Sequence, residues 1–267
     1  MDHTNAHSSH IADCIRSLLK EGHPFSLEVY EEIGSTNDRA KELEASGAPG
    51  WTAVLARRQS AGRGRMGRRF YSPLGGVYLS LLLRPDCDAA DASLFTAATA
   101  VAVCRAIHAL CGLNCRIKWP NDLLFRGRKV CGILTEAALG QGGRMDAMAI
   151  GIGLNLHLPS GGFPPELKDA GALFSTEQPC PSFTETAAAL LNALHEQLFD
   201  MPHRRFLPEY RQRSMLIGKS IAVLQRGETR PATVRGIDEN AGLCVEYPDG
   251  AKETLLSGEI SIREDNC

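Results

Sequence analysis

Residues 59–70 read Q-S-A-G-R-G-R-M-G-R-R-F, and the rest of the chain is organised around them. Six arginines and no acidic residue lie between Arg57 and Arg69, and three glycines interleave them. Each glycine would cost a helix about 1 kcal/mol, and none would help a strand. We therefore expect a mobile loop that closes over an anion, because glycine lets backbone N–H groups approach a ligand and arginine suits carboxylate and phosphate oxygens. The alternative is a solvated basic loop without a ligand.

The composition narrows the kind of ligand. The chain has 267 residues and a formal net charge of −2, so the basic loop stands in a near-neutral background. This favours a specific anionic ligand over a polyanion such as DNA. The nine cysteines include no C-x-x-C pair, so we expect reduced core thiols in a cytoplasmic protein and no metal site. The N-terminus lacks a signal pattern and no apolar run approaches the roughly 18 residues that span a bilayer, so we expect no membrane contact.

The first 50 residues predict a leader, two helices and a strand. Residues 1–10 are polar and are expected to be disordered, and apolar spacing predicts a short helix over 11–20 and a strand over 25–33. One helix before the first strand leaves no room for a helix-turn-helix DNA reader. Ser35 is a good N-cap for a helix to about residue 46, with Asp38 three residues on as in a capping box. Ser35, Thr36 and Asn37 serve as this cap, as polar contacts for a small head group, or as both.

The middle of the chain predicts an α+β fold with a mixed, largely antiparallel sheet backed by helices. Strands are expected over residues 51–57, 77–83, 113–119, 129–136 and 145–156, with a long Ala-rich helix over 88–110. Turns at 126–127 and 141–143 join successive strands like hairpins. Asn121 and Asp122 follow a strand end, where ligands often bind. Gly132 marks a bulge or a close backbone approach, and Gly151 with Gly153 predicts either a flat ligand or a tightly packed helix.

The C-terminal part predicts a second unit. A Gly- and Pro-rich loop over 159–181 precedes an amphipathic helix over 183–199 and a further helix to about residue 214. From residue 217, short alternating strands separated by turns predict a small β-barrel of about 50 residues. We expect residues 1–24 to form the leader and short helix, 25–215 the ligand-binding domain and 216–267 the barrel.

Taken together, these segments resemble biotin–protein ligases from about residue 25 to the C-terminus. The matching segments, in the family's order and spacing, are Ser35-Thr36-Asn37, Gln59, G-R-G-R-M-G-R-R at 62–69, K-W-P-N-D at 118–122, K-V-C-G-I-L at 129–134 and G-I-G-L-N at 151–155. The arginine motif followed by K-W-P-N-D is the specific pair. The resemblance implies a class II synthetase-like biotin/lipoate ligase fold with an SH3-like C-terminal barrel. No DNA-binding domain is expected at the N-terminus, and therefore neither DNA binding nor a repressor role.

The resemblance also implies a two-step reaction. Biotin's carboxylate attacks the α-phosphate of ATP, and a lysine of a biotin carboxyl carrier protein domain then attacks the resulting biotinyl-5′-adenylate. ATP and biotin are the implied substrates, Mg²⁺ accompanies the phosphates, and a homodimer is plausible by family analogy. The reaction needs cations, because a carboxylate and a triphosphate repel each other.

The resemblance assigns residues to three roles. The catalytic residues would be Arg63, Arg65 and Lys129. Biotin would contact Ser35, Thr36, Asn37, Gln59, Gly62, Arg63, Gly64, Arg65, Lys129 and Gly132. ATP would contact Arg65, Arg68, Phe70, Asn121, Asp122 and Asn155. Asp122 would orient the metal, the carrier lysine or Lys129, and Phe70 stands where many relatives carry tryptophan.

Three alternatives stay open. A lipoate–protein ligase shares this fold, but its substrate has no ureido group, so exchange of Gln59 or Thr36 should hardly affect it. A nucleic-acid-binding regulator would use the arginines on DNA, with a strong salt dependence. A catalytically silent binding protein is the third. For a ligase, we expect residues 62–72 to be poorly ordered until the ligands bind.

Overall fold

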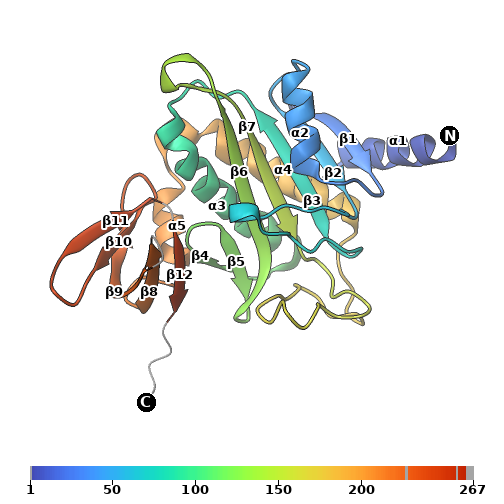
Figure 1. Cartoon of the computed structure of the whole chain (residues 1–267). Helices are drawn as coiled ribbons and strands as arrows, with labels where there is room; N and C mark the ends of the chain where they lie inside the picture. Colours follow the sequence, from blue (N-terminus) through green and yellow to red (C-terminus); the bar gives the residue numbers. More distant parts are fainter. Residues whose placement is uncertain (1, 226–227, 257, 263–267) are drawn as a thin grey trace.

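The computed structural model describes residues 2–225, 228–256 and 258–262, and within them the strands form two sheets (Figure 1). The larger sheet has the strand order β1-β2-β3-β7-β6-β5-β4. Its strands are β1 (Ser26–Tyr30), β2 (Thr52–Ala56), β3 (Val77–Leu83), β4 (Arg116–Lys118), β5 (Asp122–Phe125), β6 (Arg128–Leu139) and β7 (Met145–Leu154). Only β1 and β2 pair in parallel there. The predicted mixed, largely antiparallel sheet is therefore confirmed.

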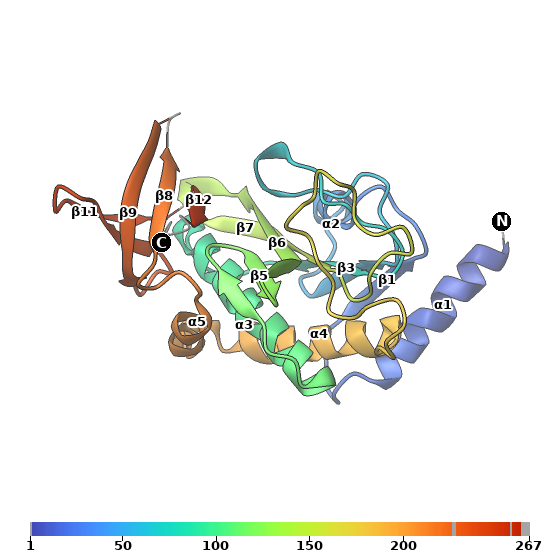
Figure 2. The same ribbon diagram turned by 90° about the horizontal axis from the view of Figure 1, so that it is seen from below.

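Helices cover both faces of this sheet. They are α1 (Asp2–Ser17), α2 (Thr36–Ala45), α3 (Ala92–Cys111), α4 (Phe183–Phe199) and α5 (Leu207–Arg213). Figure 2 shows α3 and α4 side by side on one face, while α2 lies on the other face against β2, β3 and β7. All seven residues of β3 are buried, because β3 has helices on both sides.

The hairpins and the α2 cap follow the sequence prediction. The turn between β5 and β6 places Arg126 and Gly127 at φ values of 49° and 76°, and the turn between β6 and β7 places Gly142 and Gly143 at 69° and 79°. Ser35 caps α2 by accepting a hydrogen bond from the backbone N–H of Asp38 at 3.3 Å.

Two predictions about helices were wrong. Helix α1 begins at Asp2 rather than at residue 11, so residues expected to be a disordered leader are helical. Buried Ile11, Ala12 and Ile15 anchor the helix, and no glycine or proline before them stops its propagation. The second prediction was that no apolar run approaches the length that spans a bilayer. The stretch Ala89–Cys111 is long and apolar enough to cross a membrane. Its apolarity has a structural cause, because twelve residues of α3 are buried and the helix packs against α4 and β6.

The second sheet holds five strands, in the part of the chain where short alternating strands were predicted. They are β8 (Ser220–Gln225), β9 (Glu228–Ile237), β10 (Leu243–Glu246), β11 (Lys252–Leu255) and β12 (Glu259–Ile262), paired antiparallel in the order β11-β10-β9-β8-β12. Buried Trp119, from the K-W-P-N-D segment, donates its indole N–H to the carbonyl of Ala241 at 2.9 Å. Arg211 donates to the carbonyl of Ile237 at 2.8 Å. These bonds attach the small sheet to the end of the large domain.

We predict that Trp119→Phe lowers the free energy of unfolding by about 1–3 kcal/mol, because the buried Ala241 carbonyl loses its donor. Urea unfolding followed by fluorescence and circular dichroism measures this. Trp51→Phe is the matched control, since its indole N–H has no hydrogen bond within the described residues and its ring packs on Phe25 and His195. Equal effects of the two substitutions would contradict the prediction.

Candidate functional site

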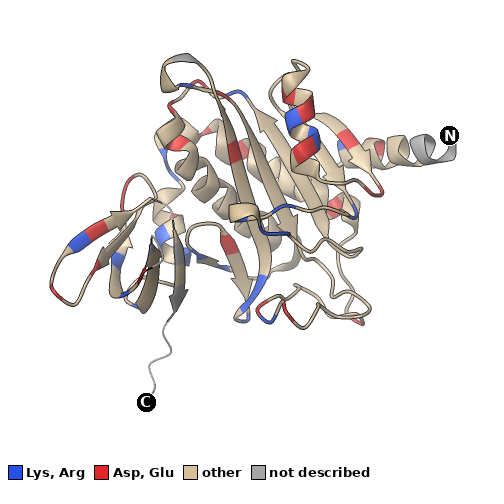
Figure 3. Cartoon of the chain, viewed as in Figure 1, with Lys and Arg blue, Asp and Glu red and all other residues tan. Residues whose placement is uncertain are grey.

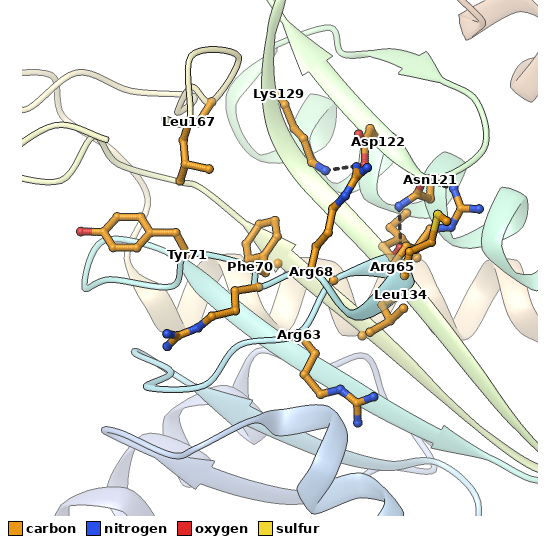
Figure 4. A pocket seen from close by; sticks show the side chains of 18 of the residues that line it. Arg63, Arg65, Arg68, Phe70, Tyr71, Asn121, Asp122, Lys129, Leu134 and Leu167 are labelled. Atoms are coloured by element: carbon orange, nitrogen blue, oxygen red, sulfur yellow. Dashed lines mark hydrogen bonds and ion pairs between the residues drawn. The ribbon is translucent and has the colours of Figure 1, made fainter. Parts of the chain in front are cut away.

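A cavity of about 640 Å³ lies where the arginine loop, residues 57–76 between β2 and β3, crosses β6 and β7 (Figures 1 and 4). Fourteen of the fifteen predicted site residues line it. They are Ser35, Thr36, Asn37, Gln59, Arg63, Gly64, Arg65, Arg68, Phe70, Asn121, Asp122, Lys129, Gly132 and Asn155. Gly62 is the exception. It is buried, and a side chain there would collide with the Phe70 carbonyl and the Ser72 hydroxyl of the loop itself.

The arginine loop folds back on itself as a small hairpin. The N–H of Phe70 donates to the Gly62 carbonyl at 2.9 Å, and the N–H of Gly64 donates to the Arg68 carbonyl at 2.7 Å. At the tip, Met66 and Gly67 have φ values of 57° and 73°, which reverse the chain. The hairpin therefore presents arginines from a defined backbone, with glycine at the closest approaches.

Two of the predicted catalytic cations lie at the cationic end of the cavity. The Lys129 ammonium lies 2.7 Å from an Asp122 carboxylate oxygen and 5.9 Å from the centre of the Phe70 ring. Lys129 is one of the three partners considered for Asp122, and the two side chains form an ion pair. Arg65 donates to the side-chain oxygen of Asn121 at 3.1 Å. Figure 4 shows Arg68 reaching toward the same Asp122.

Arg63 lies differently from the other cations. Its guanidinium makes contacts of 2.5 Å with Asp38 and 3.1 Å with Glu136, and its side chain points away from Lys129 (Figure 4). The hydrogen bond with Asp38 raises the pKa of Arg63, and the charge of Glu136 adds to the effect. The expected capping box is incomplete. The Asp38 carboxylate pairs with Arg63 and does not accept the backbone N–H of Ser35. Arg63 is therefore paired with two carboxylates of the protein itself.

The strand glycines make room for side chains of this chain. At Gly151 a Cβ would collide with the Asn37 side chain at the start of α2, so the packed-helix alternative applies there. At Gly153 a Cβ would collide with the Phe70 ring, and at Gly132 it would lie 3.0 Å from that ring. The close approach expected at Gly132 is confirmed. The β6 bulge falls instead at Val130, because Leu123 pairs with Cys131 and Leu124 with Lys129.

Sequence reasoning missed the loop that forms one wall of the cavity. Phe163, Glu166, Leu167, Lys168, Asp169 and Ala170 line it, and so do Gly258 and Ile260 from the C-terminal sheet. The Lys129 N–H donates to the Asp169 carbonyl at 2.7 Å, and the Asn155 side chain donates to the Gly171 carbonyl at 2.9 Å. The length of the 159–181 loop was the available signal, since long loops inside compact domains are often functional.

The two ends of the cavity offer different chemistry. Ser35, Thr36 and Gln59 give uncharged donors and acceptors to the end where Asn37 packs on Gly151, whereas Arg65, Arg68 and Lys129 make the end near Gly132 cationic. The other basic residues that line the cavity are Arg63, Arg69, Lys118 and Lys168. The acids lining it are Asp122, Glu166 and Asp169. No three metal-ligating side chains gather anywhere in the described part of the chain. The arrangement suits an elongated ligand with a polar head and an anionic tail beside a second anion.

Acidic residues also flank the arginine loop. Figure 3 shows its basic residues crossing the sheet between acidic positions on α2, β5 and β6.

In β6, burial raises the pKa of the Cys131 thiol well above its ordinary value. Cys131 is therefore a protonated packing residue, as expected for the core cysteines.

We predict that Gly153→Ala loosens the arginine loop, because the new methyl group displaces the Phe70 ring. Overpacking of this kind costs about 1–3 kcal/mol, so trypsin should cleave the loop at least several-fold faster. Mass spectrometry of the fragments identifies the cut sites. Gly236→Ala is the matched control, because a Cβ there meets open space. Unchanged cleavage of the Gly153 variant would show that the ring does not hold the loop.

Comparison with known proteins agrees with this geometry. Residues 29–155 match the Biotin/lipoate A/B protein ligase family, and residues 216–263 match the Biotin protein ligase C terminal domain. The chain is 34% identical over 244 residues to the bifunctional ligase/repressor BirA of Bacillus spizizenii, covering 88% of this chain and 73% of that protein. It is 30% identical over 243 residues to the biotin–[acetyl-CoA-carboxylase] ligase of Mycobacterium tuberculosis, covering 88% of each.

A solved structure extends the likeness to the whole fold. The biotin protein ligase from Aquifex aeolicus, in complex with biotin and ATP, superposes with a TM-score of 0.73 and 26% identity, covering 90% of this chain and 99% of that one. The two family models, the two relatives and the superposition all indicate the same family. The chain therefore belongs to the biotin protein ligase family.

Proposed function

We propose that this protein activates biotin with ATP and transfers it to a lysine of a biotin carboxyl carrier protein domain. The observation that carries the proposal is one cavity that is lined both by the uncharged groups of Ser35, Thr36 and Gln59 and by cations that include Arg65, Arg68 and Lys129. Biotin has this form, with a ureido ring at one end and a carboxylate at the other. The Aquifex relative solved with biotin and ATP supports the choice of substrates.

In the first step, a biotin carboxylate oxygen attacks the α-phosphorus of ATP and the bond to pyrophosphate breaks. We assign Lys129 and Arg65 to the two anions, since negative charge must be offset where they meet. Lys129 has a half-buried side chain held by Asp122 and Phe70. It is therefore already positioned at the cavity wall before any ligand binds.

The nucleotide would occupy the side of the cavity that the 159–181 loop closes. Tyr71 and Phe163 form an edge-to-face pair with centroids 6.4 Å apart. Together with Leu167 they offer an apolar surface for the purine. Asn121, Asn155 and Arg68 supply polar groups beside it. Mg²⁺ would enter with the triphosphate, because it keeps phosphate and water ligands and needs only one or two carboxylates, for which Asp169 lines the same side of the cavity.

In the second step, the amine of the carrier lysine attacks the acyl carbon, the bond to the phosphate oxygen breaks, and AMP leaves. A mixed anhydride hydrolyses easily, so water must be excluded until the amine arrives. Closure of the arginine loop would do this, with Arg63 exchanging Asp38 and Glu136 for the ligand. Ordering of residues 62–72 on ligand binding remains a prediction.

Biotin-dependent exchange of labelled pyrophosphate into ATP tests the first step. The folded protein with Mg²⁺ should catalyse exchange with biotin and not with lipoate. Folded protein without biotin-dependent exchange would defeat the proposal, and exchange with lipoate alone would favour the lipoate–protein ligase. Transfer of label from biotin to a purified carrier domain tests the second step.

We predict that Lys129→Met lowers the exchange rate at least a hundredfold, because loss of one charge-stabilising group typically costs about 2.7–4 kcal/mol of transition-state stabilisation. Steady-state exchange at saturating biotin and ATP measures it. Lys219→Met, on an exposed residue outside the cavity, is the matched control. Equal rates for the Lys129 variant and the wild-type protein would remove Lys129 from the mechanism.

A further inference from the structure

Ser80 is a buried hydroxyl in the middle of β3 and does not line the cavity, yet its partners do. Its side chain has no solvent exposure. Its oxygen lies 2.5 Å from the side-chain oxygen of Asn37 and 2.8 Å from the hydroxyl of Thr36. Both partners line the uncharged end of the cavity. Ser80 can therefore act on a ligand only through them.

The orientation of the Asn37 amide decides where the Ser80 proton goes. The Asn37 nitrogen donates to Glu136 at 2.9 Å, which leaves its oxygen facing Ser80 as an acceptor. A serine hydroxyl has one proton to donate. An amide oxygen can only accept, whereas the Thr36 hydroxyl can also donate. The Ser80 proton therefore goes to Asn37, and the contact with Thr36 requires the proton of Thr36.

Ser80 determines which acceptor receives the hydroxyl proton of Thr36. It has two acceptors within reach, the Ser80 oxygen at 2.8 Å and the side-chain oxygen of Gln59 at 3.1 Å. The Gln59 oxygen already accepts the backbone N–H of Thr36 at 2.8 Å. While Ser80 holds the Thr36 proton, the Gln59 oxygen keeps a lone pair for a ligand. Without Ser80, the Thr36 hydroxyl would donate to Gln59 and fill that lone pair.

The Gln59 side-chain amide cannot remove this competition for the Thr36 proton by rotating by 180°. Its nitrogen donates to the Ser72 hydroxyl at 2.9 Å, and the Ser72 hydroxyl donates to the Phe70 carbonyl at 2.9 Å. A flipped amide would place its nitrogen against the N–H of Thr36, and its oxygen could accept from Ser72 only if that hydroxyl gave up the Phe70 carbonyl. The Gln59 oxygen is therefore held toward Thr36, where the state of that hydroxyl decides its capacity to accept.

Packing alone does not require a hydroxyl at position 80. The other residues of β3 are apolar or aromatic, and Ser80 pairs with Val54 on β2 and Gly151 on β7. Alanine would fit this position, because it only removes the oxygen. The two hydrogen bonds of Ser80 both end on cavity residues, so the hydroxyl contributes to the arrangement of the site and not to the packing of the strand.

We propose that Ser80 is a positioning residue that sets how many acceptors Thr36 and Gln59 offer to the two N–H groups of a ureido ring. This inference rests on the proposed biotin substrate. It makes Ser80 a determinant of selectivity for ureido acids, although it touches no substrate.

Ser80→Ala, compared with Ser214→Ala, tests the inference by biotin-dependent pyrophosphate exchange. Ser214 is also buried and its oxygen accepts the N–H of Leu216, but it lies outside the cavity. We expect the KM for biotin to rise about tenfold in Ser80→Ala, as loss of one hydrogen bond implies. The KM for ATP should stay within twofold, and Ser214→Ala should leave both unchanged.

Calorimetric titration supplies a second readout that general damage would not produce. Desthiobiotin keeps the ureido ring, so its binding should weaken as much as that of biotin, whereas ATP binding should not change. Equal losses for ATP, or an unchanged biotin KM, would overturn the role of Ser80. If Ser80→Ala does not fold, Ser80→Cys fills the position with a slightly larger side chain and a weak donor and is expected to show the same loss. A wild-type protein inactive with biotin would refute the proposed function instead.

Discussion

The site depends on one electrostatic constraint, which is that several cations must share a small cavity before any anion arrives. Like charges held together repel, so each needs a counter-charge in the ligand-free state. Asp122 lies against Lys129, and Asp38 with Glu136 lies against Arg63. These side chains are all partly exposed, with fractions between 22% and 49%. Exposed pairs of this kind contribute at most about 1 kcal/mol each, so a ligand carboxylate or phosphate can replace them at little cost.

The same constraint explains why the cations come from separate elements. Arg63 and Arg65 lie on the arginine loop, whereas Lys129 is the second residue of β6, next to the bulge at Val130. The arginine loop is closed by its own main-chain bonds, while Lys129 is fixed by main-chain bonds to the 159–181 loop. One part of the charge is therefore built into the sheet, and the other part belongs to a separate hairpin.

The uncharged end of the cavity is held by a hydrogen-bond network instead of by exposed ion pairs. Its polar groups are buried or partly buried and are bonded to one another in a chain from Glu136 through Asn37, Ser80 and Thr36 to Gln59. Buried polar groups are costly unless they are paired, and a paired network has few alternative arrangements. Glu136 also pairs with Arg63, so it links this hydrogen-bond network to the arginine loop.

Local chemistry let the sequence by itself determine the fold class, the Ser35 cap, the two hairpin turns and helix α4 at its observed bounds, 183–199. It also determined which residues would gather at the site, because the motifs of a known family carry that information. Only the tertiary structure decided that Arg63 rests on Asp38 and Glu136, that Gly151 and Gly153 receive Asn37 and Phe70, and that residues 163–170 form a wall. The reason is physical. Caps, turns and periodicity act over a few residues, whereas the direction of a long arginine and the occupant of a strand glycine are set by partners far away in the chain.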